Sequence, residues 1–283
     1  MTYFGFLALF LLPPLFLLLV VSWQDHRIGR EVPPNFRTWS PRVVILAHIV
    51  VAVLYTTPWD NYLVATRVWW YDPDLVTGIL IGWVPIEEYT FFVLQTLLSG
   101  LWIVYLMRHT QLWHNPFYEN VSQNRKQRGR WMVFALLFLI WIVSIGLLTF
   151  GQKSSAYLAL ELGWALPPIL FQIWFGGDIL WRYRRLVTVG IAVPTIYLCL
   201  GDAIAIGAGT WTISPTQSTG LMVGNLPIEE ILFFLITNTL VVFGMVLVMA
   251  KESRNRAPRQ LIDWLDRLLQ PTPPMIQSQR TAN

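Results

Sequence analysis

The chain has 283 residues, of which 55% are hydrophobic and 13% are charged, and its formal net charge at pH 7 is +4. Charged residues make up roughly a quarter of a soluble globular domain, so this composition excludes an ordinary soluble domain. The only cysteine, Cys199, leaves no partner for an intrachain disulfide and no C-x-x-C metal site.

Seven apolar stretches follow one another along the chain, each close to or above the length of about 20 residues that crosses a bilayer. No Lys or Arg precedes the first stretch, whereas a cleaved signal peptide begins with a positive region, so we expect this stretch to be a retained helix. The sequence therefore predicts an all-α, polytopic membrane protein with seven transmembrane helices. The stretches lie near residues 3–23, 42–58, 78–107, 131–150, 155–176, 186–208 and 220–250.

Lys and Arg residues gather in every second connection between these stretches, while the alternate connections hold only Arg67 and Lys153. Basic loops stay on the cytoplasmic side of a membrane, so we predict that the N-terminus lies outside and the C-terminus in the cytoplasm of a cell membrane. The positive charge is thus an orientation signal, with attraction to anionic lipid as a second interpretation. We expect no nucleic-acid partner.

The residues after the last stretch begin with RQLIDWLDRLLQ, which predicts a helix with one apolar face lying along the cytoplasmic membrane surface. That face consists of Leu261, Trp264, Leu265 and Leu268. The final PTPPMIQSQRTAN is polar and rich in proline, which is typical of a disordered tail.

Two copies of one pattern stand 142 residues apart, WVPIEEYTFF at 83–92 and NLPIEEILFF at 225–234. The same offset aligns Asp60 with Asp202 and Trp69 with Trp211, and a longer loop aligns Pro13-Pro14 with Pro167-Pro168. One helix between two three-helix units gives both units the same orientation, which makes a parallel repeat. We predict four regions: a first repeat at 1–108, a basic loop and linking helix at 109–154, a second repeat at 155–252, and an amphipathic helix and tail at 253–283.

Ionisable groups inside a membrane are costly and usually face a cavity where they have a function. We expect a pseudo-two-fold axis along the membrane normal to direct Glu87, Glu88, Glu229 and Glu230 into one central cavity. Desolvation and a neighbouring carboxylate both disfavour ionisation, so each pair can supply a neutral acid beside an ionised base. A purely structural alternative puts Pro85 at the first helical position and the glutamates in the first turn, where the helix dipole favours anions.

Other residues at the same level belong to this predicted site. We expect ring faces among the nearby aromatic residues to stabilise a carbocation, at ~0.5–2 kcal/mol each, although most such residues serve as interface anchors or packing. Asp60 and Asp202 either relay protons or cap loops, and Gln95 and Thr237 bond either a glutamate or another helix. The aromatic candidates are Trp83, Phe91, Phe92, Phe233 and Phe234.

Histidine and glycine patterns give no further site. His48 has no counterpart, because Gly190 occupies the matching position, and no predicted span offers a two-histidine metal constellation. The sequence also lacks G-x-G-x-x-G after a strand and a P-loop, so we expect no metal and no nucleotide or flavin cofactor.

The paired Pro-Ile-Glu-Glu motifs, each preceded by Asp-Pro or Ser-Pro and by Gly-x-x-x-Gly, resemble those of the membrane-integral lycopene cyclases. The resemblance covers residues 1–108 and 155–252 and is closest to the fused form of a two-subunit enzyme. It implies a flavin-free, redox-neutral cyclisation of lycopene or γ-carotene end groups to β-rings, with the four glutamates as acid and base. It leaves open whether the chain associates with other carotenoid enzymes. Asp72-Pro73 has Ser214-Pro215 as its counterpart, so the two units differ at this loop.

Several alternatives stay open from the residues alone. A carotenoid end-group hydratase begins with the same protonation but lets water capture the cation. A glutamate-type intramembrane protease needs E-E-x-x-x-R, but Phe92 and Phe234 stand at the Arg positions. A retinal photoreceptor needs a lysine in the middle of the last span, where the chain has none, and a proton-coupled transporter is not excluded.

Overall fold

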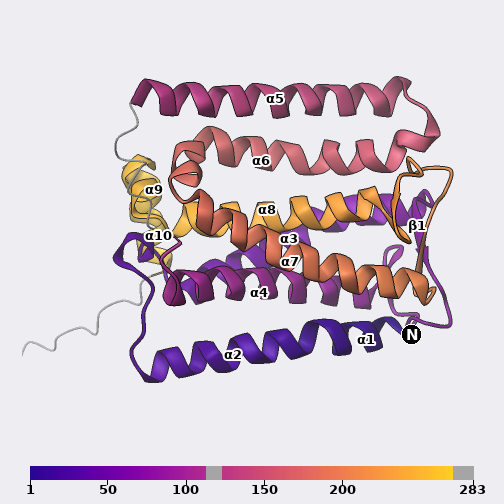
Figure 1. Cartoon of the computed structure of the whole chain (residues 1–283), viewed down its shortest axis with the longest axis horizontal. Helices are drawn as coiled ribbons and strands as arrows, with labels where there is room; N and C mark the ends of the chain where they lie inside the picture. The colour runs from indigo at the N-terminus through magenta and orange to yellow at the C-terminus, as the bar shows by residue number, and fades with distance from the viewer. Residues whose placement is uncertain (113–122, 270–283) are drawn as a thin grey trace, which may run out of the picture.

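The computed structural model describes residues 1–112 and 123–269, most of which are helical (Figure 1). Seven helical segments in the described part are long and apolar enough to cross a membrane. The helices are α1 Tyr3–Phe6, α2 Leu12–Arg27, α3 Pro41–Ala65, α4 Ile86–His109, α5 Gln123–Phe150, α6 Ala156–Arg182, α7 Arg184–Gly207, α8 Ile228–Met249, α9 Lys251–Arg256 and α10 Arg259–Leu269. A π-helical turn, Leu7–Leu11, joins α1 to α2 into one span, and 3-10 turns lie at Pro34–Phe36 and Lys153–Ser155.

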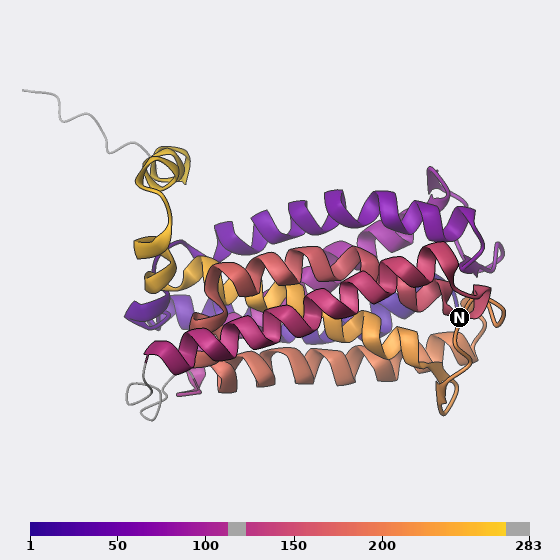
Figure 2. The same cartoon turned by 90° about the horizontal axis from the view of Figure 1, so that it is seen from above.

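The long helices run side by side, with the N-terminus and β1 at one end of the bundle and α9 and α10 at the other (Figures 1 and 2). In the most apolar stretch of each helix, 61% of α4 and 56% of α8 is buried, against 6% of α5. The helices α4 and α8 therefore form the centre of the bundle, and α5 lies along α6 at its edge (Figure 1).

The third and seventh spans begin later than the apolar stretches 78–107 and 220–250 predict, because the first residues of each stretch fold as a β-hairpin. Strands β2 Leu80–Ile81 and β3 Val84–Pro85 pair antiparallel before α4. Strands β5 Met222–Val223 and β6 Leu226–Pro227 pair in the same way before α8. Apolar content alone does not separate a hairpin from a helix, so the apolar stretches gave the wrong starts.

Glycine and proline set these hairpins. Gly82 and Gly224 have φ of 71° and 66°, the positive φ that a two-residue hairpin turn requires. Pro85 and Pro227 then cap α4 and α8 with extended backbone conformation rather than occupying the first helical position. The two glutamates after each proline consequently fall in the first helical turn.

A third pair of strands joins the loops that follow α3 and α7. Strand β1 Trp69–Tyr71 pairs antiparallel with β4 Trp211–Ile213. Trp70 faces Thr212 at the centre of the pair, and Trp69 faces Ile213 while Tyr71 faces Trp211. Since Trp70 and Thr212 are also 142 residues apart, this register is unchanged when the two strands are exchanged.

Polar side chains link α4 and α8 across the centre of the bundle. The Gln95 amide donates to the Thr237 hydroxyl at 2.8 Å, and Ser99 donates to Asn238 at 2.5 Å. Of the two roles expected for Gln95 and Thr237, the structure has the contact between helices, since the two side chains bond each other. Such bonds stabilise transmembrane helix pairs by about 0.6 kcal/mol on average.

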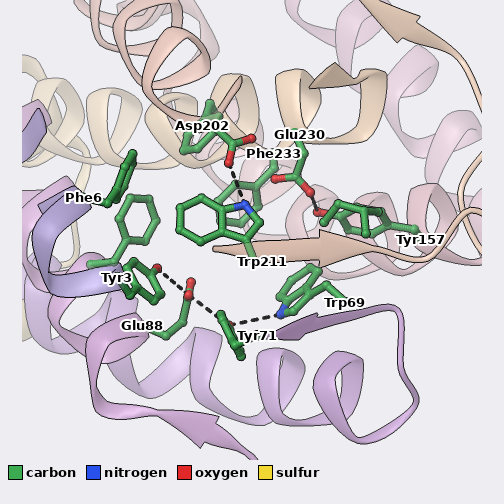
Figure 3. Close-up of a pocket in the computed structure, with 13 residues that line it drawn as sticks. Tyr3, Phe6, Trp69, Tyr71, Glu88, Tyr157, Asp202, Trp211, Glu230 and Phe233 are labelled. Atoms are coloured by element: carbon green, nitrogen blue, oxygen red, sulfur yellow. Dashed lines mark hydrogen bonds between the residues drawn. The ribbon is translucent and has the colours of Figure 1, made fainter. Parts of the chain in front are cut away.

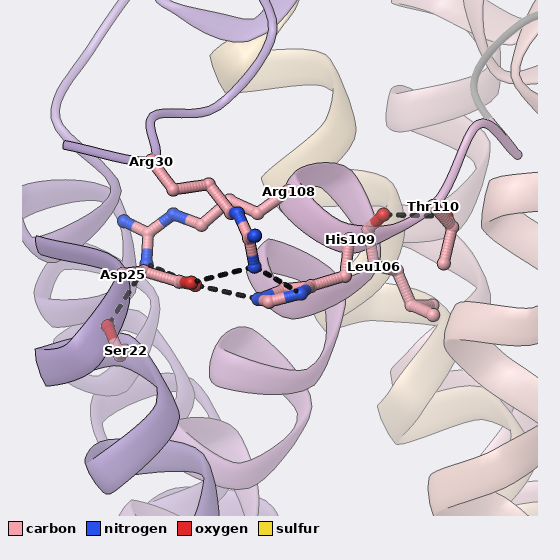
Figure 4. Close-up of polar contacts among 7 residues, drawn as sticks. All are labelled: Ser22, Asp25, Arg30, Leu106, Arg108, His109 and Thr110. Carbon is pink, nitrogen blue, oxygen red and sulfur yellow. Dashed lines mark hydrogen bonds and ion pairs between the residues drawn. The ribbon is translucent and has the colours of Figure 1, made fainter. Parts of the chain in front are cut away.

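At the end of the bundle remote from β1, a buried aspartate ties α2 to α4 (Figure 4). Asp25 is 2% exposed, and its carboxylate lies 2.8 Å from Nε2 of His109 and 3.6 Å from Arg108. Arg30 approaches both Asp25, at 3.4 Å, and Nδ1 of His109, at 3.0 Å. Because a guanidinium only donates, Nδ1 accepts from Arg30 and Nε2 donates to Asp25.

Two predicted segments fall partly or wholly beyond the described residues. The tail predicted to be disordered, 271–283, lies outside them, as do residues 113–122 of the predicted basic loop. The predicted surface helix corresponds to α10, Arg259–Leu269, in which Trp264 is exposed.

Candidate active site

A small cavity of about 40 Å³ lies at the β1–β4 end of the bundle (Figure 3). We call it the aromatic cavity, because aromatic rings supply most of its wall. Three carboxylic acids, Glu88, Asp202 and Glu230, and Ile213 complete the lining. The aromatic lining residues are Tyr3, Phe6, Trp69, Tyr71, Phe91, Tyr157, Trp211, Phe233 and Phe234.

Glu88 enters this cavity from the first turn of α4 and is 8% exposed. Two phenols donate to the same carboxyl oxygen, Oε2: Tyr3 at 2.5 Å and Tyr71 at 3.0 Å. Tyr3 comes from α1 and Tyr71 from β1, so the N-terminal helix and the inter-strand sheet both fix this carboxyl. Burial and the neighbouring Glu88 carboxyl raise the pKa of the Tyr71 phenol, which keeps it a donor.

Glu230 enters the cavity from the first turn of α8 and is 6% exposed. Its Oε1 accepts a hydrogen bond of 2.6 Å from the Tyr157 phenol on α6. In the view of Figure 3, Glu88 and Glu230 lie on opposite sides of the Trp211 indole. The two carboxyls therefore line one cavity from two different helices.

Glu87 and Glu229 differ from the expectation that all four glutamates face one cavity, because neither is among its lining residues. Each accepts a hydrogen bond of 2.6 Å from a backbone N–H ten residues earlier, Glu87 from Thr77 and Glu229 from Thr219. Adjacent residues on a helix point in directions about 100° apart, so both members of a pair cannot face the same space. These two side chains bind the loops that lead into the hairpins.

The two predicted aspartates are buried beside the cavity. Asp202 is 1% exposed, lines the cavity and accepts a hydrogen bond of 2.9 Å from Trp211 Nε1. Asp60 is fully buried and lies within electrostatic reach of Glu88, but it is not a lining residue. Neither Asp60 oxygen has a hydrogen-bond partner among the described residues.

Three of the five predicted aromatic residues line the cavity and two do not. Phe91, Phe233 and Phe234 line the cavity, and Phe92 is buried against Phe91 with ring centroids 6.3 Å apart. Trp83 is 64% exposed at the turn of the first hairpin and is not a lining residue. A residue at a tight hairpin turn projects away from the bundle, which separates Trp83 from the other four.

The electrostatics of the cavity follow from its lining, which contains no Lys, Arg or His. Carboxyl groups that share a space without a cation cannot all ionise cheaply, because each charge disfavours the next. Such a set can hold protons and exchange them, which is the requirement for paired acid and base catalysis. In the described part of the chain, the cavity included, no group of three or more His, Cys, Asp or Glu residues is arranged to hold a metal ion.

Sequence reasoning missed the residues that contact the two glutamates. Tyr3 and Tyr157 each stand ten residues before a Pro-Pro pair, Pro13-Pro14 and Pro167-Pro168, so the alignment of those prolines carried the signal. Tyr71 left no such signal, because its counterpart at the 142-residue offset is an isoleucine.

Glu161 was also missed, although it is an ionisable residue in an apolar span. It lies one helical turn beyond Tyr157, is fully buried, and has no hydrogen-bond partner among the described residues for either oxygen. It is within electrostatic reach of Glu230 and Glu229. Its position inside a predicted span was the signal that identifies it.

Comparisons with known proteins give one consistent result. The family described as lycopene cyclase matches residues 32–107 and 154–248. A lycopene beta-cyclase of Halobacterium salinarum is 36% identical over 250 residues, which cover 87% of this chain and 95% of that protein.

Longer fungal proteins match as well. The bifunctional lycopene cyclase/phytoene synthase of Blakeslea trispora is 37% identical over 227 residues, 76% of this chain and 36% of that protein. The protein of the same name from Phycomyces blakesleeanus is 36% identical over 219 residues, 74% of this chain and 34% of its own length. No solved structure matches the chain.

Proposed function

The chain belongs to the lycopene cyclase family, and we propose that it acts as a lycopene β-cyclase whose reaction takes place in the aromatic cavity. The observation that supports this site is the meeting of Glu88 and Glu230 in one buried, cation-free space lined by aromatic rings. Such a space can give a proton to an apolar alkene and take one back while water is kept away.

The reaction that we propose conserves atoms and electrons. A neutral carboxyl donates H⁺ to C2 of the terminal C1=C2 bond, which leaves a tertiary cation at C1. The π electrons of C5=C6 then form the C1–C6 bond and leave the cation at C5. A carboxylate removes the proton from C6, and the C6–H electrons form C5=C6 of a β-ring, so one proton enters and one leaves.

Aromatic rings suit this cation. A ring face attracts a nearby cation by ~0.5–2 kcal/mol, and the rings of Trp211, Phe233 and Phe234 line the same cavity as the two glutamates. We propose that Glu87 and Glu229 hold the hairpins behind the site, since each binds a loop backbone N–H. Trp83, at the exposed hairpin turn, is then outside the reaction space.

The volume of the cavity indicates that it widens when substrate enters. About 40 Å³ is space for water-sized molecules, whereas pockets for organic ligands are typically ~300–1,000 Å³. We propose that the aromatic lining separates to admit one end group of lycopene or γ-carotene and closes around it. Closure also excludes the water that captures the cation as an alcohol.

We also propose that spans 1–3 and 5–7 form two parallel repeats joined by α5. The register of β1 with β4 supports this, because Trp70 and Thr212 are counterparts and face each other. The bond from Gln95 to Thr237 is a second contact between counterparts 142 residues apart. A pseudo-two-fold axis passing through both contacts accounts for the two observations.

The orientation that we propose puts the N-terminus and the aromatic cavity toward the outer side of a cell membrane and α9 and α10 on the cytoplasmic side. The basic loops support this orientation, and α10 supports it with Trp264 exposed for contact with membrane lipid. Lycopene dissolves in the membrane, so access through the lipid suits the site. We also propose that the chain associates with other carotenoid enzymes, because an apolar substrate then passes directly from one enzyme to the next.

Expression in a lycopene-accumulating bacterium tests the proposed function. The wild type should convert lycopene to β-ring products of unchanged mass. Glu88→Gln and Glu230→Gln should each lower β-ring formation by at least ~10²-fold, the lower end of general acid–base contributions. Glu31→Gln is the matched control, because the Glu31 side chain is 65% exposed and pairs only with Arg37 among the described contacts.

Three outcomes contradict the proposal in different ways. Normal β-ring formation by both Glu88→Gln and Glu230→Gln contradicts the assignment of the reaction to this cavity. Wild-type products heavier by one water indicate a hydratase. Unchanged lycopene with wild-type protein, together with proton flux in vesicles that Glu88→Gln or Glu230→Gln abolishes, indicates a transporter.

A further inference from the structure

The two halves of the aromatic cavity are not chemically equal. Each half contributes one lining glutamate, one phenol from the start of an apolar span, one glutamate that binds a loop, and one buried aspartate. Each of these features in one half has a counterpart in the other half, so they favour neither Glu88 nor Glu230 as the acid. Among the groups that can donate or carry a proton, two have an aliphatic residue as their counterpart, Tyr71 and Glu161.

Tyr71 gives Glu88 a second hydrogen-bond donor. Its phenol and that of Tyr3 both donate to Oε2 of Glu88, at 3.0 and 2.5 Å, whereas Glu230 accepts from Tyr157 alone among the described residues. The counterpart of Tyr71 is Ile213, which has no donor. Hydrogen bonds to a carboxylate favour its ionised form, so Tyr71 favours the anion at Glu88.

Glu161 has the opposite effect on Glu230. It is fully buried one turn beyond Tyr157 and within electrostatic reach of Glu230 and Glu229. Neither of its oxygens has a hydrogen-bond partner among the described residues. Glu161 stands six residues before Pro167, and the matching position six residues before Pro13 holds Leu7, so the extra carboxyl belongs to the second half alone.

An additional carboxyl without a cation favours protonated forms in its surroundings, because neighbouring like charges repel. Glu161 thus places an extra carboxyl within electrostatic reach of Glu230 in the second half. In the first half Glu88 has Asp60 as a buried neighbour within electrostatic reach, as Glu230 has Asp202. The difference between the halves thus rests on Glu161 and Tyr71 together, and both act in the same direction.

We infer that Glu230 donates the proton to C2 and that Glu88 removes the proton from C6, with Glu161 and Tyr71 as the positioning residues that set these roles. This inference rests on the proposed function. The proton taken by Glu88 returns to Glu230 before the next ring closure, so none is consumed. Asp202 lines the cavity within electrostatic reach of both glutamates and is placed to carry that proton.

The roles predict different products from the two glutamate variants. Without the acid, the substrate is never protonated, so Glu230→Gln should leave lycopene unchanged. Without the base, ring closure still occurs but the C5 cation loses a proton from C4 or from the C5 methyl group, or captures water. Glu88→Gln should therefore form ε-type, γ-type or hydroxylated rings, at a rate lowered ~10²-fold or more, the lower end of general acid–base contributions.

The test uses the full-length protein in liposomes with lycopene in D₂O, with products separated by chromatography and analysed by mass and by deuterium position. Every ring from Glu88→Gln should carry one deuterium at C2. Non-β rings from Glu230→Gln, unreacted lycopene from both variants, or the same mixture from both overturns the assignment. Normal β-rings from both variants instead contradict the proposed function, so the two failures are distinguishable.

The positioning residues have their own readouts. Tyr71→Phe should release a minor share of non-β rings, which a change confined to stability does not produce. Tyr55→Phe is its matched control, since Tyr55 on α3 is exposed and donates to the Trp164 backbone carbonyl on α6. Glu161→Gln should slow ring closure about tenfold, which corresponds to ~1.4 kcal/mol, with only β-rings formed. Glu161→Asp should restore most of the rate. Unchanged product ratios in Tyr71→Phe, or equal losses in Glu161→Gln and Glu161→Asp, contradict these roles.

Discussion

The first and second halves of this protein share a backbone frame but differ in the side chains around the two glutamates that line the aromatic cavity. In both halves a loop N–H binds a glutamate at 2.6 Å, and a phenol binds the next glutamate at 2.5 or 2.6 Å. Around this frame, Tyr71 of the first half has Ile213 as its sequence counterpart, and Glu161 of the second half has Leu7 as its counterpart. The comparison teaches that the shared contacts position two carboxyls, while the unshared residues distinguish them.

One link is kept even though its chemistry is reversed. In the first half, the side chain of Asn61 on α3 accepts from the hairpin N–H of Trp83 at 2.7 Å. In the second half, the hairpin side chain of Asn225 donates to the carbonyl of Ala203 on α7 at 2.6 Å. Asn61 and Ala203 are counterparts, as are Trp83 and Asn225. The helix-to-hairpin link is therefore preserved while the residue that makes it changes sides.

The largest effect on stability should come from the shared frame. Glu87→Ala and Glu229→Ala each leave a loop N–H without its acceptor, which costs ~1–3 kcal/mol for a buried group. We expect similar decreases in the thermal unfolding midpoint of the two purified variants in detergent. A decrease in the unfolding midpoint of only one variant contradicts the equivalence of the two loop contacts.

A smaller effect should separate the phenols. Tyr157→Phe removes the described donor to Glu230 and should lower β-ring formation about tenfold, which corresponds to ~1.4 kcal/mol. Tyr3→Phe should lower it less, because Tyr71 still donates to Glu88. The double variant Tyr3→Phe with Tyr71→Phe should match Tyr157→Phe in initial rate. Equal losses in the two single variants contradict the unequal support of the glutamates.

The reversed asparagine link should contribute about 1 kcal/mol of stability in each half, as a typical net hydrogen bond does. Asn61→Ala should cost more than Asn225→Ala, because Asn61 also donates to Tyr89 and to the Thr57 carbonyl. Denaturation of the purified variants in detergent measures the difference. A larger loss from Asn225→Ala reverses the expected order.

The smallest effect should come from the contact between counterparts at the centre of the bundle. Gln95→Leu or Thr237→Ala alone should cost about 0.6 kcal/mol, the average for a polar contact between transmembrane helices. The exchange of both residues, Gln95→Thr with Thr237→Gln, should restore the contact and the unfolding midpoint. An exchange variant less stable than either single variant argues against a two-fold axis at this contact.

The seven spans could be predicted from the sequence because apolar length is a local property that the bilayer imposes on each helix. The starts of α4 and α8 could not, since the hairpins before them are as apolar as the helices that follow. There, the positive φ of Gly82 and Gly224 decides the conformation, and the Pro at the end of each hairpin marks where the helix begins.

The candidate site, too, could be predicted from the sequence only in part. Adjacent glutamates marked both places in the sequence, and burial of charge made them expensive enough to notice. Only the tertiary structure decided that Glu88 and Glu230 share a cavity while Glu87 and Glu229 bind loops. The 100° step between neighbouring helical residues separates the members of each pair, and which member faces inward depends on how α4 and α8 are rotated against their neighbours.

The sequence by itself determined that this chain occupies a membrane and carries paired acids in two corresponding places, because hydropathy and internal similarity are properties of the residues in order. The partners of those acids come from distant parts of the chain. Tyr3 is 85 residues from Glu88, and Tyr157 is 73 residues from Glu230. Such contacts exist only once the helices have packed, so the tertiary structure decided which side chains contact each of the two glutamates.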